Sequence, residues 1–486
     1  MCGIVGYAGN IETACGRPLE VCLQGLERLE YRGYDSAGVA LTAPGMDKVV
    51  VRKKAGRLKN LVEDIERKPM PLATVGIGHT RWATNGEPSD VNAHPHTSMD
   101  GKVAIIHNGI IENASQLRLD LQAEGYRFAS ATDTEVAAKL LGKIVDKIIA
   151  DEGKPDLFKA VRRMARMLEG AFTILATDCR QPDIVVGARH DSPLVVGLGE
   201  GENFLGSDVA AFVAYTKRAM EVDQDQAVCV SADKVIVADF NGNVVENPKT
   251  YTVDWDASAA EKGGWDSFMD KEIHEDPAAV QRTLLGRFDT NGDITLDEVR
   301  IDEHDFKAID KIIVVACGTA SYAGQVAKYA IEHWVRIPVE IELAHEFRYR
   351  DPILTPRTLV VAISQSGETM DTLMALRHAR EQGSKVLAIC NTQGASIPRE
   401  SDAVLYTHAG PEVAVASTKA FVAQITAAYL LGLYLAQVKG AMFRDEIHQM
   451  LDSLKDMPRK IQWVLDTQPK TIQAAAERMV NANSFL

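Results

Sequence analysis

The sequence predicts an α+β layered domain at the N-terminus and an α/β domain with a doubly wound parallel sheet after it. With 486 residues, the chain is longer than one hydrophobic core usually supports. Residues 1–240 contain short apolar segments separated by Gly and Asp turns, which is typical of a strand-rich layered domain. From about residue 301, apolar runs alternate with helical segments, which predicts a parallel sheet with helices on both faces.

The first domain is expected to contain one early helix and several strands. Leucines at 19, 23, 26 and 29 recur at helical spacing and predict a helix over roughly 18–30. A strand is expected over 103–106, followed by a tight turn at 107–109. Further strands are expected at 172–176, 184–187 and 194–197.

The second half is expected to begin after a polar, irregular linker at 241–300. Continuous apolar runs predict buried strands at 312–316, 359–363 and 386–389. Small-residue loops follow the first two runs, where parallel sheets bind their ligands. The segment 421–438 is long enough to raise the question of a membrane span, but its polar residues Gln424 and Thr426 indicate a buried core helix.

The end of the chain reads as the beginning of a strand at residues 483–486. A domain rarely ends inside an opening strand. We therefore expect one complete α/β domain at 301–445, the incomplete start of another at 446–486, and a truncated chain.

Composition narrows the function classes. The net charge of -14 argues against nucleic acid as a partner, although a local pocket can still bind a small anion. The seven cysteines form neither a CxxC pair nor a Cys/His metal spacing, so we expect no metal site and a reducing, cytoplasmic location.

Cys2 is the first candidate for chemistry. A small residue at position 2 allows removal of Met1, which leaves one residue with a thiol and a free α-amine. An α-amine titrates near ~8 and can take the thiol proton, so nucleophile and base would be one residue. The alternative is that Cys2 is merely the second residue of a buried strand.

Five further segments accompany Cys2, namely YRGYDSAG (31–38), GHTRWAT (78–84), NAHPH (92–96), HNGIIEN (107–113) and TDTE (132–135). In this order they resemble the class II glutamine amidotransferase domain of the N-terminal-nucleophile hydrolase type, an αββα sandwich, over about the first 240 residues.

The resemblance assigns roles to individual positions. It implies that Cys2 is the nucleophile and that the Asn108 side chain and the Gly109 N–H form the oxyanion hole. It also implies a glutamine pocket made by four residues: Arg81 for the carboxylate, Asp133 for the ammonium, Trp82 and Thr84. The alternatives are a surface ion pair for Arg81, a helix N-cap for Asp133 and a simple turn for Asn108.

A second group of motifs lies in the α/β half: ACGTAS (316–321), ISQSGET (363–369) and VASTK (415–419). Hydroxyls and free N–H groups at a helix N-terminus suit a phosphate, although helix capping is the commoner role of Ser and Thr. These motifs resemble the sugar isomerase (SIS) domain, and 446–486 would then be the start of a second such domain.

The two halves together resemble the glucosamine-6-phosphate synthase family. The resemblance implies phosphate binding by Thr319, Ser364, Gln365, Ser366 and Thr369, and sugar binding by Ser417. Cys317 is interpreted as a small residue near the sugar and not as a catalytic thiol.

The resemblance implies a glutamine-dependent amidotransferase that converts fructose 6-phosphate and glutamine to glucosamine 6-phosphate and glutamate. We expect this enzyme to need no metal or redox cofactor and to bind no nucleic acid or membrane. We also expect it to form a homodimer where the isomerase region is complete. No residue of this sequence matches the family's isomerisation residues, so we expect the chain to retain only the glutaminase half-reaction.

Two rival functions remain open. A glutamine phosphoribosyl amidotransferase shares the first domain but needs an acidic pyrophosphate-binding loop where SQSGET stands. A regulatory sugar-phosphate-binding SIS protein would usually carry a helix-turn-helix, which this sequence does not show. Retention of Met1, detected by mass spectrometry, would favour a binding role.

Overall fold

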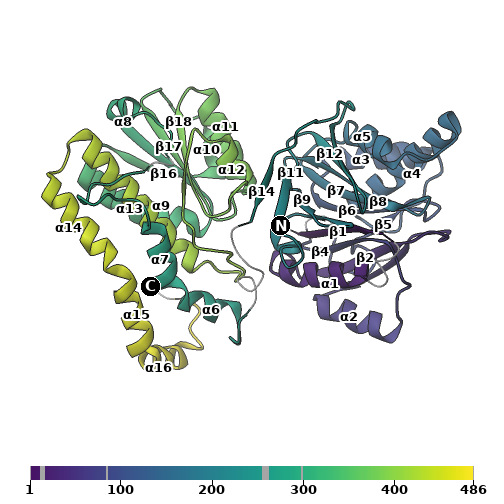
Figure 1. The fold of residues 1–486 in the computed structure, drawn as a ribbon, viewed down its shortest axis with the longest axis horizontal. Helices are drawn as coiled ribbons and strands as arrows, with labels where there is room; N and C mark the ends of the chain where they lie inside the picture. The colour runs from purple at the N-terminus through teal and green to yellow at the C-terminus, as the bar shows by residue number, and fades with distance from the viewer. Residues whose placement is uncertain (1, 11–16, 84–85, 254–261, 297–298, 485–486) are drawn as a thin grey trace. The chain divides into compact units, whose positions relative to one another are not determined.

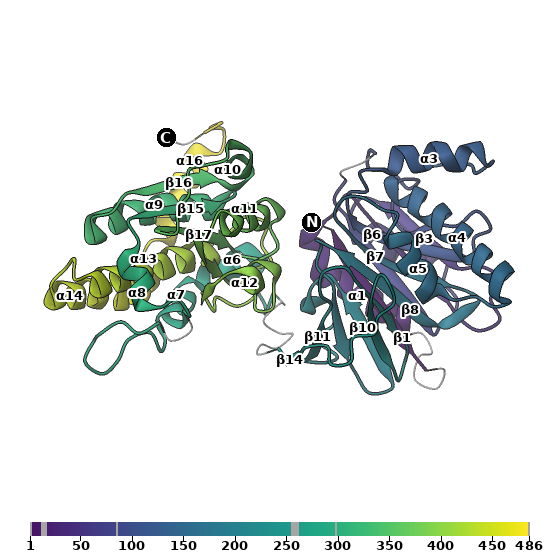
Figure 2. The same ribbon diagram turned by 90° about the horizontal axis from the view of Figure 1, so that it is seen from above.

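The structure is a computed structural model that describes residues 2–10, 17–83, 86–253, 262–296 and 299–484. The chain divides into two compact units, residues 1–260 and residues 261–486. Figures 1 and 2 show each unit as strands enclosed by helices.

The first unit contains two antiparallel sheets. Among its described residues, one sheet has the order β14 (Thr250–Thr252), β11 (Arg218–Glu221), β9 (Val195–Leu198), β10 (Glu202–Gly206), β1 (Gly3–Gly9), β4 (Val75–Arg81), β2 (Ser36–Thr42) and β3 (Val50–Ala55). The other has the order β13 (Val235–Asp239), β12 (Gln226–Val230), β8 (Gln181–His190), β7 (Phe172–Asp178), β6 (Val103–Gly109) and β5 (His96–Thr97). The helices are α1 (Arg17–Leu29), η1 (Glu30–Arg32), α2 (Leu58–Arg67), α3 (Ala114–Ala123), α4 (Asp133–Glu152), α5 (Leu157–Ala165) and η2 (Val209–Ala211).

Alternation along the strands builds the layers of this unit. In β1, Ile4 belongs to the core between the two sheets, whereas Val5 packs with the residues of α1. In β6, Ile106 belongs to the same inter-sheet core and Ile105 packs with the residues of α4. Because successive side chains of a strand point to opposite faces, each sheet contacts the other sheet on one face and helices on the other. The αββα sandwich is confirmed.

One local prediction in this unit is wrong. The segment 107–109 is not a tight turn, because β6 continues through Gly109 and pairs with β7, with Asn108 opposite Thr173. The Asn-Gly dipeptide favours a turn locally, but cross-strand pairing with β7 overrides that preference.

The second unit is a five-stranded parallel sheet within its described residues. Its order is β16 (Val339–Leu343), β15 (Lys311–Ala316), β17 (Thr358–Ser364), β18 (Lys385–Cys390) and β19 (Ala403–Tyr406). Its helices are α6 (Phe268–His274), α7 (Asp276–Leu284), α8 (Glu303–Ala308), α9 (Thr319–Val335), α10 (Ala344–Arg350), α11 (Met370–Glu381), α12 (Ser396–Glu400), α13 (Lys419–Lys439), α14 (Arg444–Lys455), α15 (Met457–Thr467) and α16 (Pro469–Met479).

Helices cover both faces of this sheet. On one face, Ile312 and Val314 of β15 share a core with residues of α9 and α13. On the other face, Ile313 and Val315 share a core with residues of α10, α11 and α12. The predicted doubly wound α/β architecture is confirmed.

The membrane-span question is answered by packing. α13 is long and apolar enough to cross a membrane, but 61% of its most apolar window is buried inside the protein. Leu430 and Leu433 lie in the core shared with the sheet. α13 is therefore a core helix, as its polar residues indicated.

The structure differs from two other expectations, the irregular linker at 241–300 and the strand at 483–486. The polar region 241–300 is not irregular throughout, because it contains α6 and α7, and Val280 and Leu284 of α7 join the core of the second unit. At the end of the chain, Ser484 lies outside any strand, and residues 485 and 486 lie outside the described residues.

Candidate functional site

Cys2 lies at the beginning of β1, in the middle of the first sheet, next to the end of β4. The two strands are antiparallel neighbours, with Gly3 opposite Thr80. The backbone N–H of Trp82 donates a hydrogen bond to Cys2 Sγ at 3.2 Å. The strand pairing therefore fixes the thiol beside the GHTRWAT segment.

Burial sets the protonation of this thiol. Desolvation raises the pKa of Cys2 above its ordinary value, while the Trp82 N–H and the charge of Arg81 lower it by smaller amounts. A raised pKa means that the thiol is protonated at neutral pH. A general base is therefore needed before the sulfur can act as a nucleophile.

Asn108 comes from the other sheet and reaches the same point. Its Nδ2 donates a hydrogen bond to the carbonyl oxygen of Cys2 at 2.7 Å, and the side chain is buried. Its Oδ1 lies 3.0 Å from His79 Nε2, which is also 3.0 Å from the carbonyl oxygen of His107. Because both contacts of Nε2 are to oxygen acceptors, Nε2 carries the proton and holds the Asn108 amide in one orientation.

Gly109 occupies a position that only glycine fits. Its φ is +122°, and a Cβ built there would lie 2.0 Å from the backbone oxygen of Ala171. A side chain is thus excluded directly after Asn108. Gly109 is the exposed last residue of β6, a position that suits a donor to an oxyanion.

Four buried histidines surround this point: His79, His94, His96 and His107. The rings of His79 and His94 lie 4.2 Å apart. Burial lowers the pKa of His79 to about 3 and lowers the pKa of the other three as well. All four are neutral at pH 7 and act here as packing and hydrogen-bonding groups.

Arg81 and Asp133 are both buried near the thiol. Arg81 is 4% exposed, which rules out a surface ion pair, and its charge interacts with Cys2, Asp133 and Asp35. Asp133 Oδ2 accepts a hydrogen bond from Ile111 N at 3.0 Å. The N-cap of α4 is Thr132, whose side chain accepts from Glu135 N, so Asp133 is not the cap. The structure therefore places a buried cation and a buried anion close enough for their charges to interact.

The turn after β4 is held by Asp35, a residue to which the sequence assigned no role. Asp35 Oδ2 accepts from Ala83 N at 2.8 Å, and Asp35 N donates to Arg81 O at 3.0 Å. Trp82 is 44% exposed beside Tyr34 and free to contact a ligand. Thr84 lies outside the described residues.

The second candidate site lies where the strand order of the parallel sheet reverses. From β15 the chain passes to β16 on one side and then to β17 on the other. In such sheets, ligands bind at the carboxyl ends of the strands at this switch point. Thr319 follows β15, and the segment 364–369 follows β17, so both motifs lie at this point.

The loop after β17 is closed by its own hydroxyls. Ser364 Oγ lies 3.1 Å from Thr369 Oγ1 and accepts from Gly367 N at 3.1 Å, while Ser366 Oγ accepts from Glu368 N at 3.2 Å. Gln365 contributes its backbone oxygen to Asn391 N at 3.3 Å. Thr369 is the N-cap of α11 but makes no side-chain cap hydrogen bond, and the N-cap of α9, Gly318, has no side chain to give one. The N-termini of α9 and α11, neither of which has a side-chain cap hydrogen bond, thus both lie at the switch point, an arrangement that suits an anion.

Ser417 lies in the loop that precedes α13. Glu272 accepts from Val413 N at 2.6 Å, and Glu412 accepts from Thr418 N at 3.0 Å. These buried carboxylates fix the loop from both ends. In the described part of this unit, no hydrogen bond joins Ser417 to the two phosphate-type loops, so its role stays a prediction.

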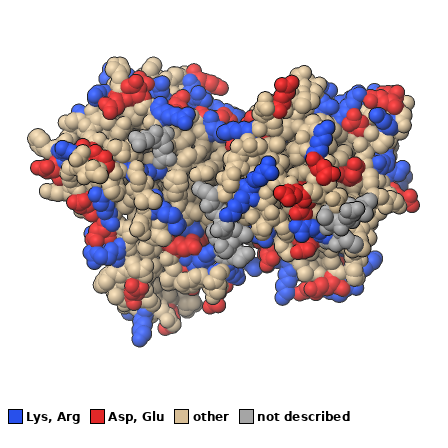
Figure 3. All heavy atoms as spheres, in the orientation of Figure 1, with Lys and Arg blue, Asp and Glu red and all other residues tan. Residues whose placement is uncertain are grey.

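Charged side chains of both signs are interspersed on the face of each unit seen in Figure 3. The acidic net charge is thus not gathered into one field on that face. The Arg81 side chain is buried, and a charge acts more strongly there than at the surface.

Comparison with known proteins identifies the family. A glutamine amidotransferase domain family matches residues 79–214, and the SIS domain family matches residues 306–434. The glutamine–fructose-6-phosphate aminotransferase (isomerizing) of Corynebacterium diphtheriae is 60% identical over 100% of this chain and 77% of its own length. The chain belongs to this aminotransferase family.

A second curated relative agrees, and one solved structure is similar in sequence to part of the chain. The glutamine–fructose-6-phosphate aminotransferase of Corynebacterium efficiens is 61% identical over 100% of this chain and 77% of its own length. A solved structure, the C-terminal domain of glucosamine-fructose-6-phosphate aminotransferase from Francisella tularensis, is 38% identical, covers 45% of this chain and 61% of that chain, and has a TM-score of 0.43. The resemblance drawn from the motifs is confirmed at the level of the family.

Proposed function

We propose that this chain takes ammonia from glutamine at Cys2, which is the glutaminase half of the reaction by which an aminotransferase of this family converts fructose 6-phosphate and glutamine to glucosamine 6-phosphate and glutamate. The observation that carries the proposal is the joining of Cys2 to Asn108 across two facing sheets, in a chain 60% identical to a named aminotransferase. A purely regulatory SIS protein would have no need of this arrangement.

The chemistry at Cys2 begins with a protonated thiol. Once Met1 is removed, the α-amine, with a pKa near ~8, takes the thiol proton. The thiolate attacks the side-chain carbonyl carbon of glutamine, and the carbonyl oxygen becomes an oxyanion. Asn108 Nδ2 and the Gly109 N–H donate to that oxygen, and each such donor stabilises the transition state by a few kcal/mol.

Collapse of the intermediate releases ammonia. The protonated α-amine returns its proton to the leaving nitrogen, and the C–N bond breaks to leave a thioester on Cys2. Water then attacks the thioester, with the same amine as base, and glutamate leaves. No step requires a further titrating residue, which agrees with the neutral state of the histidines around Asn108.

Glutamine is recognised by its two charged ends. We assign its α-carboxylate to Arg81 and its α-ammonium to Asp133, with Trp82 and Thr84 completing the pocket. The burial of both charged side chains supports this assignment, because a buried charge requires a partner of opposite sign.

Fructose 6-phosphate is assigned to the switch point of the parallel sheet. Thr319, Ser364, Gln365, Ser366 and Thr369 hold the phosphate, and Ser417 contacts the sugar. The uncapped starts of α9 and α11 support the phosphate site. We further propose a cytoplasmic protein that binds neither nucleic acid nor membranes and forms a homodimer where the isomerase region is complete.

The test is to separate the two half-reactions. Purified protein is incubated with glutamine alone, and then with glutamine and fructose 6-phosphate, while glutamate and amino sugar are measured. Mass spectrometry of the N-terminus accompanies the assay. Glutamate release from protein that begins at Cys2 supports the proposal, whereas retained Met1 with no glutamate release would contradict it.

A further inference from the structure

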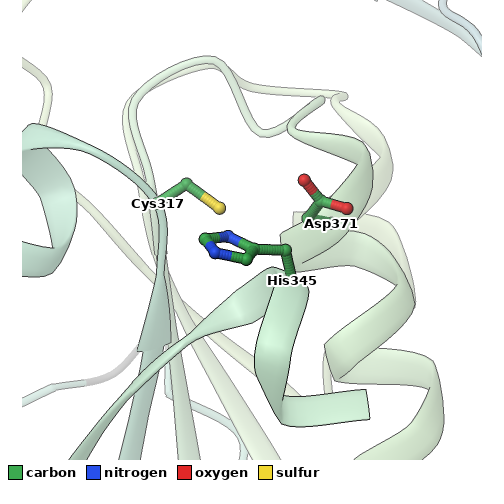
Figure 4. A group of neighbouring side chains, drawn as sticks. All are labelled: Cys317, His345 and Asp371. Carbon is green, nitrogen blue, oxygen red and sulfur yellow. The ribbon is translucent and has the colours of Figure 1, made fainter. Parts of the chain in front are cut away.

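Three side chains of different chemistry meet at the carboxyl edge of the parallel sheet. Cys317 follows β15, His345 lies in the first turn of α10 directly after β16, and Asp371 lies in the first turn of α11. Figure 4 shows all three pointing into one space. Their sulfur, nitrogen and oxygen ligand atoms lie within 4.8 Å of one another.

This set matches the preferences of one metal. A thiolate, an imidazole and a carboxylate are the three kinds of ligand that Zn²⁺ binds in proteins. With metal–ligand distances of about 2.0–2.3 Å, ligand atoms around a tetrahedral ion lie roughly 3.3–3.8 Å apart. The ligand atoms of the three residues are thus about 1 Å too far apart at most. Rotation of the partly exposed side chains can close this gap without any movement of the backbone.

The backbone that carries the three residues is fixed. Ala316 and Ala344, which precede Cys317 and His345, are 1% and 0% exposed. Thr372, directly after Asp371, is also fully buried. The three ligand positions are therefore held by the core, while the side chains themselves remain accessible to an ion.

Other interactions of these side chains are weak. His345 Nε2 lies 3.9 Å from Glu346 Oε1, an exposed pair that contributes little. Thr372 Oγ1 lies 3.9 Å from Cys317 Sγ, the limit for a hydrogen bond to sulfur. Asp371 also interacts favourably with the N-terminus of α11, which is compatible with a metal in front of it.

We propose that Cys317, His345 and Asp371 form a zinc site with three protein ligands and one open position. The ion binds the Cys317 thiolate, one imidazole nitrogen of His345 and one carboxylate oxygen of Asp371, and a water molecule fills the fourth position. Binding releases the thiol proton to solvent. This inference is independent of the function proposed for Cys2.

The test uses the full chain, stripped of metal with a chelator, in a Cys2→Ala background that removes the thiol proposed as the nucleophile of the first unit. Zn²⁺ is titrated in competition with a chromophoric chelator. We expect one equivalent per chain. Cys317→Ser, His345→Ala and Asp371→Asn should each weaken binding by more than the about 10- to 100-fold that follows the loss of a residue hydrogen-bonded to a metal ligand.

The matched control is His304→Ala, because His304 is an exposed histidine of the same unit outside the cluster. It should leave the affinity for Zn²⁺ unchanged. Co²⁺ provides a direct readout: a thiolate-to-cobalt charge-transfer band should appear in the background protein and vanish in Cys317→Ser. Failure to bind one Zn²⁺, equal affinity in Cys317→Ser, or a cobalt spectrum without that band would each overturn the site. Circular dichroism of each variant checks that the fold is retained.

Discussion

His79 should control the rate of glutamine hydrolysis without touching glutamine. Its Nε2–H holds Asn108 Oδ1 at 3.0 Å, and the opposite end of that amide donates to the Cys2 backbone at 2.7 Å. His79→Phe keeps the ring volume but removes the donor. The buried amide oxygen then loses its partner, at a cost of about 1–3 kcal/mol, and the amide is free to turn its oxygen toward the oxyanion.

The size of the expected loss of kcat in His79→Phe follows from the role of Asn108 in the oxyanion hole. Loss of one oxyanion donor lowers kcat by a factor of about 10²–10³. The kcat of Asn108→Ala for glutamine hydrolysis should therefore fall by that factor, with KM for glutamine little changed. His79→Phe should lose roughly 10- to 100-fold in kcat, equivalent to about 1.4–2.7 kcal/mol. His79→Gln, which restores an amide N–H, should recover part of this loss.

A double-mutant cycle separates this role from general damage. If His79 acts only through Asn108, the variant carrying both His79→Phe and Asn108→Ala should be no slower than Asn108→Ala alone. Glutamate release measured over a range of glutamine concentrations gives both kcat and KM. Multiplicative losses, or a rise in KM in place of a fall in kcat, would refute the positioning role.

Three further predictions concern recognition and stability. Arg81→Ala should raise KM for glutamine by roughly 10- to 150-fold, or about 1.5–3 kcal/mol for a lost charged pair, and an unchanged KM in steady-state assays would remove Arg81 from the pocket. Ser366→Ala should weaken fructose 6-phosphate binding by calorimetry and leave glutamine hydrolysis without sugar intact, whereas unaltered affinity would return Ser366 to a role inside its own loop. Burial and the charge of Glu412 raise the pKa of Asp276 to about 7. The folded state therefore keeps a proton that the unfolded state loses near pH 4. The free energy of unfolding should fall as pH rises from about 4 to about 7, because the folded state binds more protons in this range. The free energy of unfolding should fall by at most about 4 kcal/mol over this range, and Asp276→Asn should abolish the fall. Thermal midpoints of wild type and variant that run parallel from pH 4 to 8 would contradict this.

The sequence was informative wherever local pattern and chemistry coincide. The helix predicted over 18–30 is α1 (Arg17–Leu29), and the apolar runs at 312–316 and 359–363 are β15 and β17. The motif residues Cys2, Arg81, Asn108 and Asp133 are linked by one hydrogen bond and by the charge interactions of Arg81, although their individual roles remain predictions.

Features that depend on distant pairing could not be predicted. The turn expected at 107–109 is a strand because β7 pairs with it, and that partner begins at Phe172. The helices α6 and α7 lie in a segment of polar composition, which favours an irregular linker. α7 is nevertheless held in place because it packs onto a core whose other residues come much later in the chain. Cys317, His345 and Asp371 are widely separated in sequence, so no spacing rule finds a cluster that the parallel sheet assembles from three strand ends.

The central claim is that Cys2 is the nucleophile of a glutaminase. The most direct measurement is glutamate release by Cys2→Ala beside wild-type protein at saturating glutamine, with glutamine binding followed by calorimetry. We expect hydrolysis to be abolished while glutamine still binds, because the variant loses the thiolate but keeps Arg81 and Asp133. Glutamate release by Cys2→Ala above a trace would contradict it and place the nucleophile elsewhere in the chain.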